Sequence, residues 1–322
     1  MAVTLFTLGG TIAMAGRSAD QPGVVARLTG ADLTAAVPGL AEIGQHLVVR
    51  DVQAVPSASL SFAQILGLVR EVGSSEDGVV VTQGTDTVEE TAYLADLVWP
   101  HAAPLVFTGA MRNPTLAGAD GPANLLAAVR VAASPRARDL GALLVANDEI
   151  HAARWVRKTH STSTATFTSP DTGPIGHVIE GEVRILTRPE RRPVLGVPAV
   201  DGTRVALYTV SLEDDGALLE RVADTHHGLV VAAFGVGHVP ASLAPVLGEL
   251  AARIPVVLTS RSGGGSVLRH TYGAAGSEID LQRRGLVNGG LLGPYKARVL
   301  LRLLLAAGAG RDEIAAAFAE HG

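Results

Sequence analysis

The sequence predicts an α/β protein, because short apolar runs that suit buried strands alternate with stretches of helical periodicity. In the first half of the chain the predicted strands are 3–8, 47–52, 78–82, 104–108 and 141–146. The predicted helices there are 31–37, 61–72, 87–98 and 120–133. The last helix has a clear start signal, since Asp120 suits an N-cap and Pro122 suits the first turn.

A change in composition divides the chain into two predicted domains. The segment 188–203 holds three prolines and few apolar residues, so we expect a linker there between a domain over 1–187 and a domain over 204–322. The second block repeats the α/β pattern, with strands at 204–210, 228–233 and 255–259 and helices at 215–224, 241–252, 294–307 and 311–320. Two glycine-rich segments, 13–23 and 262–276, are predicted to be mobile loops of the kind that form lids.

Length and composition narrow the class of protein. The 322 residues suit about two domains, and an apolar share of 47% with a charged share of 18% describes an ordered globular chain. A net charge of −5 without a long basic run argues against nucleic acid and membrane surfaces as partners. The lack of cysteine excludes disulfides and thiolate chemistry, and the ten histidines show no metal-binding spacing, so no metal is expected. With no signal-peptide pattern and no apolar run near the ~20 residues of a membrane helix, we expect a cytoplasmic protein.

Two threonines at predicted strand ends are the main functional signal. Thr11 follows the apolar run 3–8 and a Gly-Gly turn, and Thr85 follows the run 78–82 and another glycine turn. Open α/β sheets bind ligands at the carboxyl ends of their strands. Two hydroxyls at that edge, one of them followed by the carboxylate of Asp86, are the parts of an acyl-transfer site.

Both threonine segments also have simpler interpretations, which stay open at this level. The turn 9–11 could merely join a strand to a loop, and it lacks the spacing of a nucleotide-binding loop. The segment 86–90 satisfies the capping-box pattern twice, so helix capping alone could explain Asp86, Thr87, Glu89 and Glu90, although it does not explain the turn at 84–85. A helix start at this point would equally offer N–H donors to a substrate carboxylate or an oxyanion.

Lysine is rare in this chain, which makes its two positions informative. Only Lys158 and Lys296 are lysines among the 26 basic residues. An amine that must lose a proton is a task that arginine cannot perform. Lys158 lies in the polar stretch 157–162 and is a candidate catalytic amine, whereas Lys296 begins a predicted amphipathic helix and is expected to be solvated or at an interface.

Six segments, in order over nearly the whole chain, carry recognisable motifs. Residues 8–13 read LGGTIA and residues 83–92 read QGTDTVEETA. The other four are TGAMR at 108–112, ADGPANL at 119–125, KT followed by TATF within 158–167, and PYKARVLL at 294–301. The first two resemble the TGGTIA and HGTDTMEETA signatures of bacterial-type L-asparaginases, and the six together are highly specific for that family.

The resemblance implies a fold, an activity and an assembly. The expected fold is a large N-terminal α/β domain plus a smaller flavodoxin-like C-terminal domain, assembled as a homodimer or homotetramer with active sites at subunit interfaces. The expected activity is hydrolysis of the side-chain amide of L-asparagine to aspartate and ammonia through a threonine acyl-enzyme. No cofactor or metal is implied, and the partner is a small-molecule amide.

The same resemblance implies roles for individual residues. Thr11 would be the nucleophile, and Thr85, Asp86 and Lys158 would form a second triad in which Lys158 deprotonates Thr85. In the substrate-binding set, Ser57 and Asp86 would hold the α-carboxylate and α-amino groups, Ala110 would line the amide pocket through its backbone, and Glu278 would come from the neighbouring subunit; Thr85 belongs to this set as well.

The chain departs from the family pattern at four places. The family's lid tyrosine is expected near Gly23 or Val24, yet no tyrosine occurs within 1–92. Ala58 replaces the usual glutamine after the binding serine, and Gln83 replaces the histidine before Gly-Thr-Asp. Leu8 replaces the first threonine of the first signature.

The departures leave two rival functions and one candidate replacement for the tyrosine. Because Ala58 changes the pocket, glutamine or another small ω-amide is an alternative substrate. A catalytically impaired amino-acid-binding homologue is the alternative from another class, and ammonia release separates it from an enzyme. Tyr272, six residues before Glu278, is the candidate phenol, with Glu278 as its proton acceptor.

Overall fold

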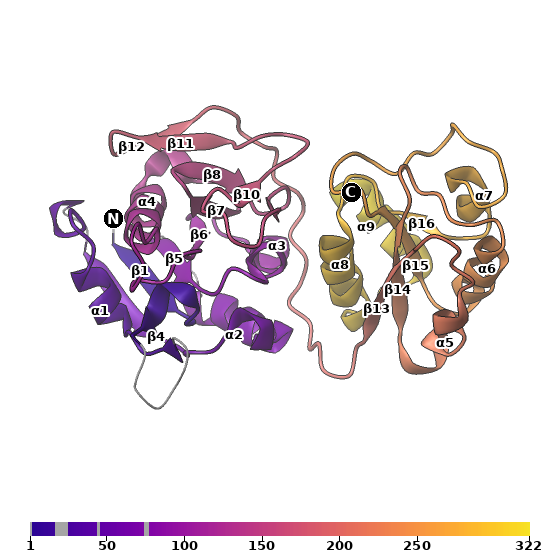
Figure 1. Cartoon of the computed structure of the whole chain (residues 1–322), viewed down its shortest axis with the longest axis horizontal. Coiled ribbons are helices and arrows are strands. Elements are labelled where there is room, and N and C mark those ends of the chain that lie inside the picture. Colours follow the sequence, from indigo (N-terminus) through magenta and orange to yellow (C-terminus); the bar gives the residue numbers. More distant parts are fainter. Residues whose placement is uncertain (1, 17–24, 44–45, 74–76) are drawn as a thin grey trace. The chain divides into compact units, whose positions relative to one another are not determined.

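The computed structural model describes residues 2–16, 25–43, 46–73 and 77–322, and it divides the chain into two compact units. Unit 1 is Met1–Leu195 and unit 2 is Gly196–Gly322 (Figure 1). The boundary falls inside the segment 188–203. The start of that segment belongs to unit 1, since the Arg191 guanidinium donates to main-chain carbonyls of Trp99 and His101.

Unit 1 is built on an eight-stranded mixed sheet with the order β12-β11-β8-β7-β6-β5-β1-β4. Its strands are β1 (Val3–Thr7), β4 (Leu47–Asp51), β5 (Gly78–Thr82), β6 (Leu105–Thr108), β7 (Ala142–Ala146), β8 (Glu149–Ala152), β11 (Gly176–Ile179) and β12 (Glu182–Ile185). The strands β4, β1, β5, β6 and β7 pair in parallel, and β8, β11 and β12 extend the sheet in antiparallel pairs. The five parallel strands confirm the five strands predicted in this half, within a residue at either end.

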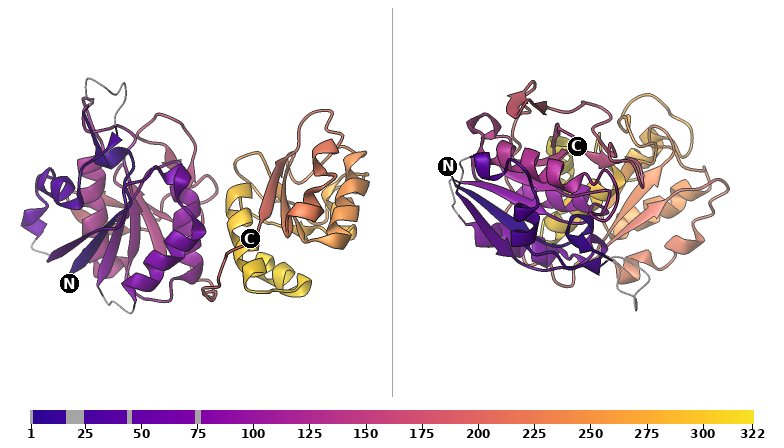
Figure 2. Two further views of the ribbon diagram at one scale, coloured as in Figure 1. Left: turned by 90° about the horizontal axis from the view of Figure 1, so that it is seen from below. Right: turned by 60° about the vertical axis from the view of Figure 1, so that its left-hand side comes forward.

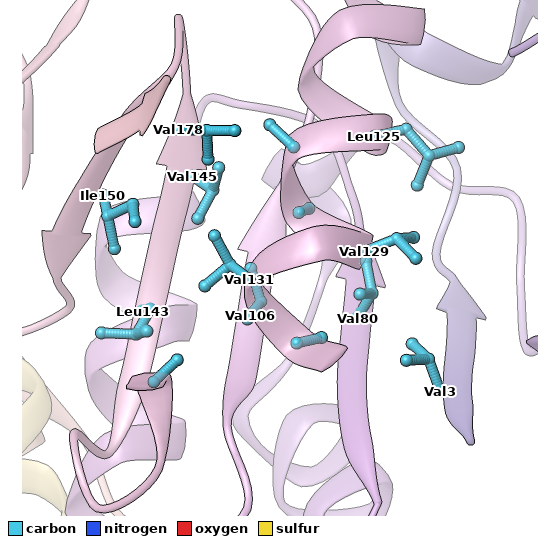
Figure 3. Close-up of a cluster of buried hydrophobic side chains, with 14 of the residues drawn as sticks. Val3, Val80, Val106, Leu125, Val129, Val131, Leu143, Val145, Ile150 and Val178 are labelled. Atoms are coloured by element: carbon cyan, nitrogen blue, oxygen red, sulfur yellow. The ribbon is translucent and has the colours of Figure 1, made fainter. Parts of the chain in front are cut away.

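The helices of unit 1 cover both faces of this sheet (Figure 2). They are α1 (Gly30–Ala35), α2 (Phe62–Val72), α3 (Val88–Val98) and α4 (Gly121–Ala133). Leu125 and Val129 of α4 pack with Val80 and Val106 of the sheet in one apolar cluster (Figure 3), while α2 and α3 lie over the opposite face. All five residues of β5 are buried, as expected for a parallel strand that is covered on both faces.

The parallel strands reverse their order at one point. In chain order they are β1, β4, β5, β6 and β7, but in space they run β4-β1-β5-β6-β7. The direction of winding therefore changes between β1 and β5. A crevice at the carboxyl ends of the strands beside such a switch point is where open α/β sheets bind ligands.

Two short ribbons, which the sequence patterns did not predict, complete unit 1. The ribbons pair β2 (Met14–Ala15) with β3 (Val25–Ala26) and β9 (Arg157–Lys158) with β10 (Phe167–Thr168). Two-residue strands carry no detectable alternation of apolar and polar residues, so only the fold reveals them. The second ribbon matters here because it carries Lys158.

Unit 2 is a smaller α/β domain with a four-stranded parallel sheet. Its strands are β13 (Val205–Thr209), β14 (Gly228–Ala233), β15 (Val256–Ser260) and β16 (Val287–Asn288), and its helices are α5 (Val222–Thr225), α6 (Leu243–Arg253), α7 (Glu278–Arg283), α8 (Pro294–Ala306) and α9 (Arg311–His321). Leu243 and Leu247 of α6 pack with Leu229 and Val231 of the sheet in one core cluster, to which Leu281 of α7 also contributes. The two-domain α/β prediction is therefore confirmed, with the larger domain first.

Unit 2 differs from the prediction in its strand order, in the helix predicted at 215–224 and in the exposure of Lys296. The order β13-β14-β15-β16 is sequential, without the reversal of a flavodoxin-like sheet, and that reversal instead occurs in unit 1. The predicted helix 215–224 is instead a 3₁₀ turn, Ala217–Leu219, followed by the short α5. Gly216 is left-handed just before the turn, and Arg221 leaves helical geometry between the turn and α5. Lys296, predicted to be solvated or at an interface, is only 3% exposed within the chain itself, which rules out the solvated alternative.

A glycine at the start of β5 gives a test of how tightly α4 packs on the sheet. A Cβ atom on Gly78 would lie 1.9 Å from the carbonyl oxygen of Ala132 in α4, and a backbone atom cannot swing away. We therefore expect Gly78→Ala to lower the free energy of unfolding by about 3 kcal/mol. The midpoint of urea denaturation measures this change.

The matched control is Gly67→Ala, in the middle of α2, where a Cβ would meet nothing within 4 Å. This second substitution should raise stability by about 0.5–1 kcal/mol, because alanine favours a helix interior. Equal midpoints for Gly78→Ala and the unaltered protein would contradict the close approach of α4 to β5.

Candidate active site

The predicted site residues of unit 1 gather at the carboxyl ends of four neighbouring strands. Thr11 follows β1, and Ser57 follows β4 at the start of a 3₁₀ turn, Ser57–Ser59. Thr85 follows β5, and Ala110 follows β6. Since β4, β1, β5 and β6 are adjacent in the sheet, all four residues share one edge, on both sides of the switch point.

The turns before the two threonines are in close main-chain contact. Gly10 has a φ of +89°, and a Cβ built on it would lie 2.2 Å from the Gly84 nitrogen. Only glycine satisfies both the left-handed conformation and the missing space. The hydrogen bond from the Leu8 N–H to the Thr82 carbonyl, at 2.9 Å, holds the same two strand ends together. Gly10 is thus needed for the close approach of its turn to the Gly84 turn, beyond merely joining a strand to a loop.

Lys158 reaches the Thr85 turn from the β9–β10 ribbon. Its Nζ donates to Thr85 Oγ1 at 3.0 Å and lies 2.7 Å from Asp86 Oδ1. The Lys158 side chain is 17% exposed, while that of Asp86 is 70% exposed and open to a ligand. Three of the predicted catalytic residues therefore form one contiguous cluster.

Ser57 presents a buried hydroxyl to the same turn. The residue is 2% exposed, and within the described parts of the chain its Oγ has no hydrogen-bond partner. A Cβ on Gly84 would lie 2.8 Å from this oxygen, so the absence of a side chain at Gly84 leaves room around the hydroxyl. An unpaired buried hydroxyl costs about 1–3 kcal/mol, which a bound carboxylate would offset. The loop that carries Ser57 is held by Thr87, whose hydroxyl donates to the Ser57 carbonyl at 3.0 Å.

Ala110 is held by a network that the sequence patterns assigned to helix capping. Asp120 occupies the N-cap position of α4, but its side chain makes no cap hydrogen bond, contrary to the prediction. Its carboxylate instead accepts the N–H groups of Met111 and Arg112 at 2.8–3.1 Å. Asn124 donates to the Gly109 carbonyl at 3.0 Å from the other side. The main chain around Ala110 is therefore clamped on both sides, as a backbone-lined pocket requires.

The capping-box interpretation of 86–90 is also wrong in detail. Thr87 is the N-cap of α3, yet its side chain makes no cap hydrogen bond because it is turned to the Ser57 loop. Glu89 is 8% exposed and accepts the Lys158 main-chain N–H at 2.5 Å. Sequence reasoning gave Glu89 no role beyond capping, and no local signal could show its partner.

Gln83 supports the turn in place of the family's histidine. It is fully buried, its Oε1 accepts the Thr91 hydroxyl at 2.9 Å, and its Nε2 donates to the Gly84 carbonyl at 3.2 Å. The amide therefore ties the first turns of α3 to the glycine that touches Gly10. This departure from the family pattern preserves a hydrogen-bonded support.

Glu278 lies in unit 2, at the start of α7. It is fully buried; its Oε1 accepts the N–H groups of Thr271 at 3.0 Å and Tyr272 at 2.6 Å, and its Oε2 pairs with His238 Nε2 at 3.2 Å. Burial raises the pKa of Glu278, but the hydrogen bonds from Tyr272, from its own N–H, from Thr271 and from His238 outweigh burial and hold the pKa below 4.5.

The proposed pairing of the Tyr272 phenol with Glu278 is not formed. Tyr272 gives Glu278 its main-chain N–H, while its ring packs edge-on against His238 with the centroids 4.9 Å apart. Among the described residues, the donors that the Glu278 carboxylate meets are the N–H groups of Thr271, Tyr272 and Glu278 itself and the ring of His238, not the Tyr272 hydroxyl. The predicted position of the family tyrosine, near Gly23 or Val24, lies outside the described residues.

A serine, a histidine and a glutamate also meet elsewhere in unit 1. His151 Nδ1 lies 3.0 Å from Ser169 Oγ, and His151 Nε2 lies 3.2 Å from Glu149 Oε2. The order resembles a serine-hydrolase triad, but Ser169 and His151 are both buried away from any substrate. The hydrogen bond between His151 and Ser169 instead connects β8 to the residue that follows β10.

Two kinds of feature are absent from the described part of the chain. There, no helix is long and apolar enough to cross a membrane. In the same residues, no group of three histidine, aspartate or glutamate side chains is arranged to hold a metal ion.

The site combines threonine and serine hydroxyls with a lysine and a carboxylate at the switch point of an α/β sheet. These groups are typical of enzymes that transfer acyl groups through a hydroxyl nucleophile instead of a thiolate. Residues 2–191 match the family described as "Asparaginase, N-terminal", and residues 204–318 match "Glutaminase/Asparaginase C-terminal domain". The chain belongs to the asparaginase family of amidohydrolases.

Named relatives match nearly the whole chain. A probable L-asparaginase of Deinococcus radiodurans is 34% identical, with 99% of this chain and 97% of that protein covered. A probable periplasmic L-asparaginase of Haemophilus influenzae is 35% identical, with coverages of 94% and 88%. A crystal structure of a probable cytoplasmic L-asparaginase from Campylobacter jejuni has a TM-score of 0.86 and 29% identity, with 99% of each chain covered.

The lowered pKa of Glu278 predicts a pH dependence for the stability of unit 2. A carboxyl whose folded pKa lies below its ordinary value of 4.5 stabilises the fold above that pH, and this stabilisation is lost as the pH falls through the folded pKa. Glu278→Gln should therefore melt at a lower temperature than the unaltered protein at pH 7, and the gap should narrow steadily below about pH 4.5. Melting curves from pH 7 to pH 3 measure the difference in melting temperature between the two proteins. A difference that stayed constant over this range would contradict the charge-assisted hydrogen bonds of Glu278.

Proposed function

We propose that this chain hydrolyses the side-chain amide of L-asparagine to aspartate and ammonia. The observation that carries the proposal is the contact of Lys158 Nζ with Thr85 Oγ1 at 3.0 Å and Asp86 Oδ1 at 2.7 Å, at the strand ends that also carry Thr11. The relatives named L-asparaginase, matched over nearly their full length, support the choice of substrate.

The reaction would proceed in two acyl-transfer steps. In the first, Thr11 Oγ attacks the amide carbon, its proton passes to the leaving nitrogen, and ammonia departs as an ester forms on Thr11. In the second, water attacks the ester carbon, aspartate leaves, and the hydroxyl of Thr11 is regenerated. The backbone N–H groups at the start of α3 would be donors for the developing oxyanion, and the main chain at Ala110, held in place by Asp120 and Asn124, would line the amide pocket.

The α-carboxylate and α-ammonium groups of the substrate would be held by one hydrogen-bond donor and one acceptor, respectively. The unpaired Ser57 hydroxyl is a donor for the α-carboxylate, and the exposed Asp86 carboxylate is an acceptor for the α-ammonium group. Both lie on the loops beside Thr85. This arrangement selects a free amino acid over a simple amide.

Lys158 would serve proton transfer through Thr85. In the structure its Nζ donates to Thr85 and is paired with Asp86, so it must pass a proton on before it can accept one. Asp86 is the acceptor within reach. Thr85, Asp86 and Lys158 would therefore form a relay, and arginine could not replace the lysine because guanidinium keeps its proton.

The main alternative is the same chemistry on glutamine or another small ω-amide. It is favoured by Ala58, which stands where the family has glutamine and leaves a smaller, less polar side chain beside Ser57. The matching C-terminal family, which includes glutaminases, agrees with it. A homologue that only binds amino acids is disfavoured by the intact contact of Lys158 with Thr85.

Ammonia release with asparagine and with glutamine tests the function and its alternative together. Thr11→Ala should lower kcat at least about 1,000-fold while aspartate still binds, because the nucleophile is lost and the carboxylate-binding groups remain. Thr11→Ser, which keeps a hydroxyl, should retain measurable turnover. Ammonia release by Thr11→Ala at the rate of the unaltered protein would show that Thr11 is not the acyl acceptor.

The proposed assembly is a homodimer or homotetramer in which Glu278 completes the site of the neighbouring subunit. The proposed location is the cytoplasm, in keeping with the Campylobacter protein, although the Haemophilus relative is named periplasmic. The proposed partner is a small-molecule amide, as the family implies, and the net charge of −5 argues against nucleic acid and membrane surfaces.

Mixing two inactive variants tests the shared site. Thr11→Ala and Glu278→Gln should each be inactive alone, and subunit exchange should restore about a quarter of the activity, because half of the dimers are hybrids with one intact site of two. Glutamine keeps the volume of the buried carboxylate. Mass spectrometry verifies that the subunits have exchanged. If activity is still not recovered, each site is built within one chain.

A further inference from the structure

Lys158 is held at two points, and only one of them belongs to the proposed proton relay. Its Nζ contacts Thr85 and Asp86, as described above. Its main-chain N–H donates to Glu89 Oε2 at 2.5 Å. This second contact joins two residues 69 positions apart in the chain.

The ribbon geometry explains why the N–H of Lys158 needs a partner from outside. Successive N–H groups of a strand point to opposite sides. The Thr159 N–H is directed into the hairpin, where it donates to the Thr166 carbonyl at 2.8 Å. The Lys158 N–H is therefore directed away from β10, and Glu89 is the group that accepts it.

The loop that follows Lys158 is held by hydrogen bonds of its own. The loop between β9 and β10 is closed by the Thr159 hydroxyl, which donates to the Thr166 carbonyl at 2.9 Å, and by the His160 N–H, which donates to Thr166 Oγ1 at 3.0 Å. The loop is thus rigid within itself, and the Glu89 carboxylate connects it to α3. Loss of that connection would let the main chain of Lys158 shift relative to the Thr85 turn.

Glu89 is well placed for this task because it lies only a few residues after Thr85 and Asp86, at the start of α3. Thr85 and Asp86 precede α3, and Glu89 is the second residue of its first turn. The carboxyl group of Glu89 is buried, and its Oε2 meets the Lys158 N–H directly. One helix start therefore sets both the position of Thr85 and the backbone position from which Lys158 reaches it.

We propose that Glu89 is a positioning residue for catalysis, which holds the main chain of Lys158 so that Nζ stays within hydrogen-bond reach of Thr85. The inference rests on the proposed role of Lys158 in proton transfer. Lysine has a flexible four-carbon stem, so a shift of its backbone lowers the fraction of time in the productive contact and leaves the substrate-binding groups in place. The effect should fall on kcat more than on KM.

Three variants measure the effect of the carboxylate. Glu89→Ala should lower kcat about 30-fold or more, and Glu89→Gln should recover most of that loss, because an amide oxygen can still accept the N–H. Glu90→Gln removes the same charge from the same helix turn and should stay within about twofold, which controls for the helix dipole. A kcat of Glu89→Ala equal to that of Glu90→Gln would overturn the proposal.

A double-mutant cycle with Lys158→Met separates positioning from a general structural role. If Glu89 acts only through the Lys158 ammonium group, adding Glu89→Ala to Lys158→Met should cost no further activity. An equal loss in both backgrounds would overturn the proposal, as would a loss in Glu89→Ala that follows its melting temperature alone. If Lys158→Met were itself fully active, the proposed relay would fail; a normal Glu89→Ala beside an inactive Lys158→Met would refute only the present inference.

Discussion

The candidate site depends on a contact between two main-chain turns that leaves no room for a side chain. Gly10 and Gly84 meet at the point where the winding of the unit 1 sheet reverses, and each is followed by a threonine. Because no side chain separates the turns, Thr11 and Thr85 start from adjoining backbone on adjacent strands. Every other feature of the site is arranged around this contact.

The support of the site consists mostly of hydrogen bonds from side chains to main-chain groups. Asp120 and Asn124 clamp the segment around Ala110, and Thr87 holds the Ser57 loop. Glu89 holds Lys158. Each of these bonds fixes a loop at the edge of the sheet, where no ladder of strand hydrogen bonds is available. A rigid site can therefore be built from loops if their backbone polar groups are tied to helix starts.

Much of the fold could be predicted because many of its strands and helices have a recognisable local pattern of apolar residues. The parallel strands of unit 1 and the long helices were recognisable from apolar runs and helical periodicity, since a buried strand must be apolar along its whole length. The additional strands β8, β11 and β12 and the two ribbons were not recognisable, because they are short and partly exposed. The continuous helix predicted at 215–224 was wrong, because Gly216 is left-handed before the 3₁₀ turn and Arg221 leaves helical geometry between that turn and α5.

The sequence by itself determined the family, the strand ends that carry the chemistry, and residues that act within one turn of each other, such as Thr85 and Asp86. Only the tertiary structure decided which distant groups meet. Lys158 finds Thr85 across 73 positions, and Glu89 and Asp120 turn away from the capping roles that their motifs suggest. The physical reason is that a carboxylate at a helix start satisfies whichever N–H groups packing brings closest, and a local motif is the same whether those donors lie in its own helix or in another loop.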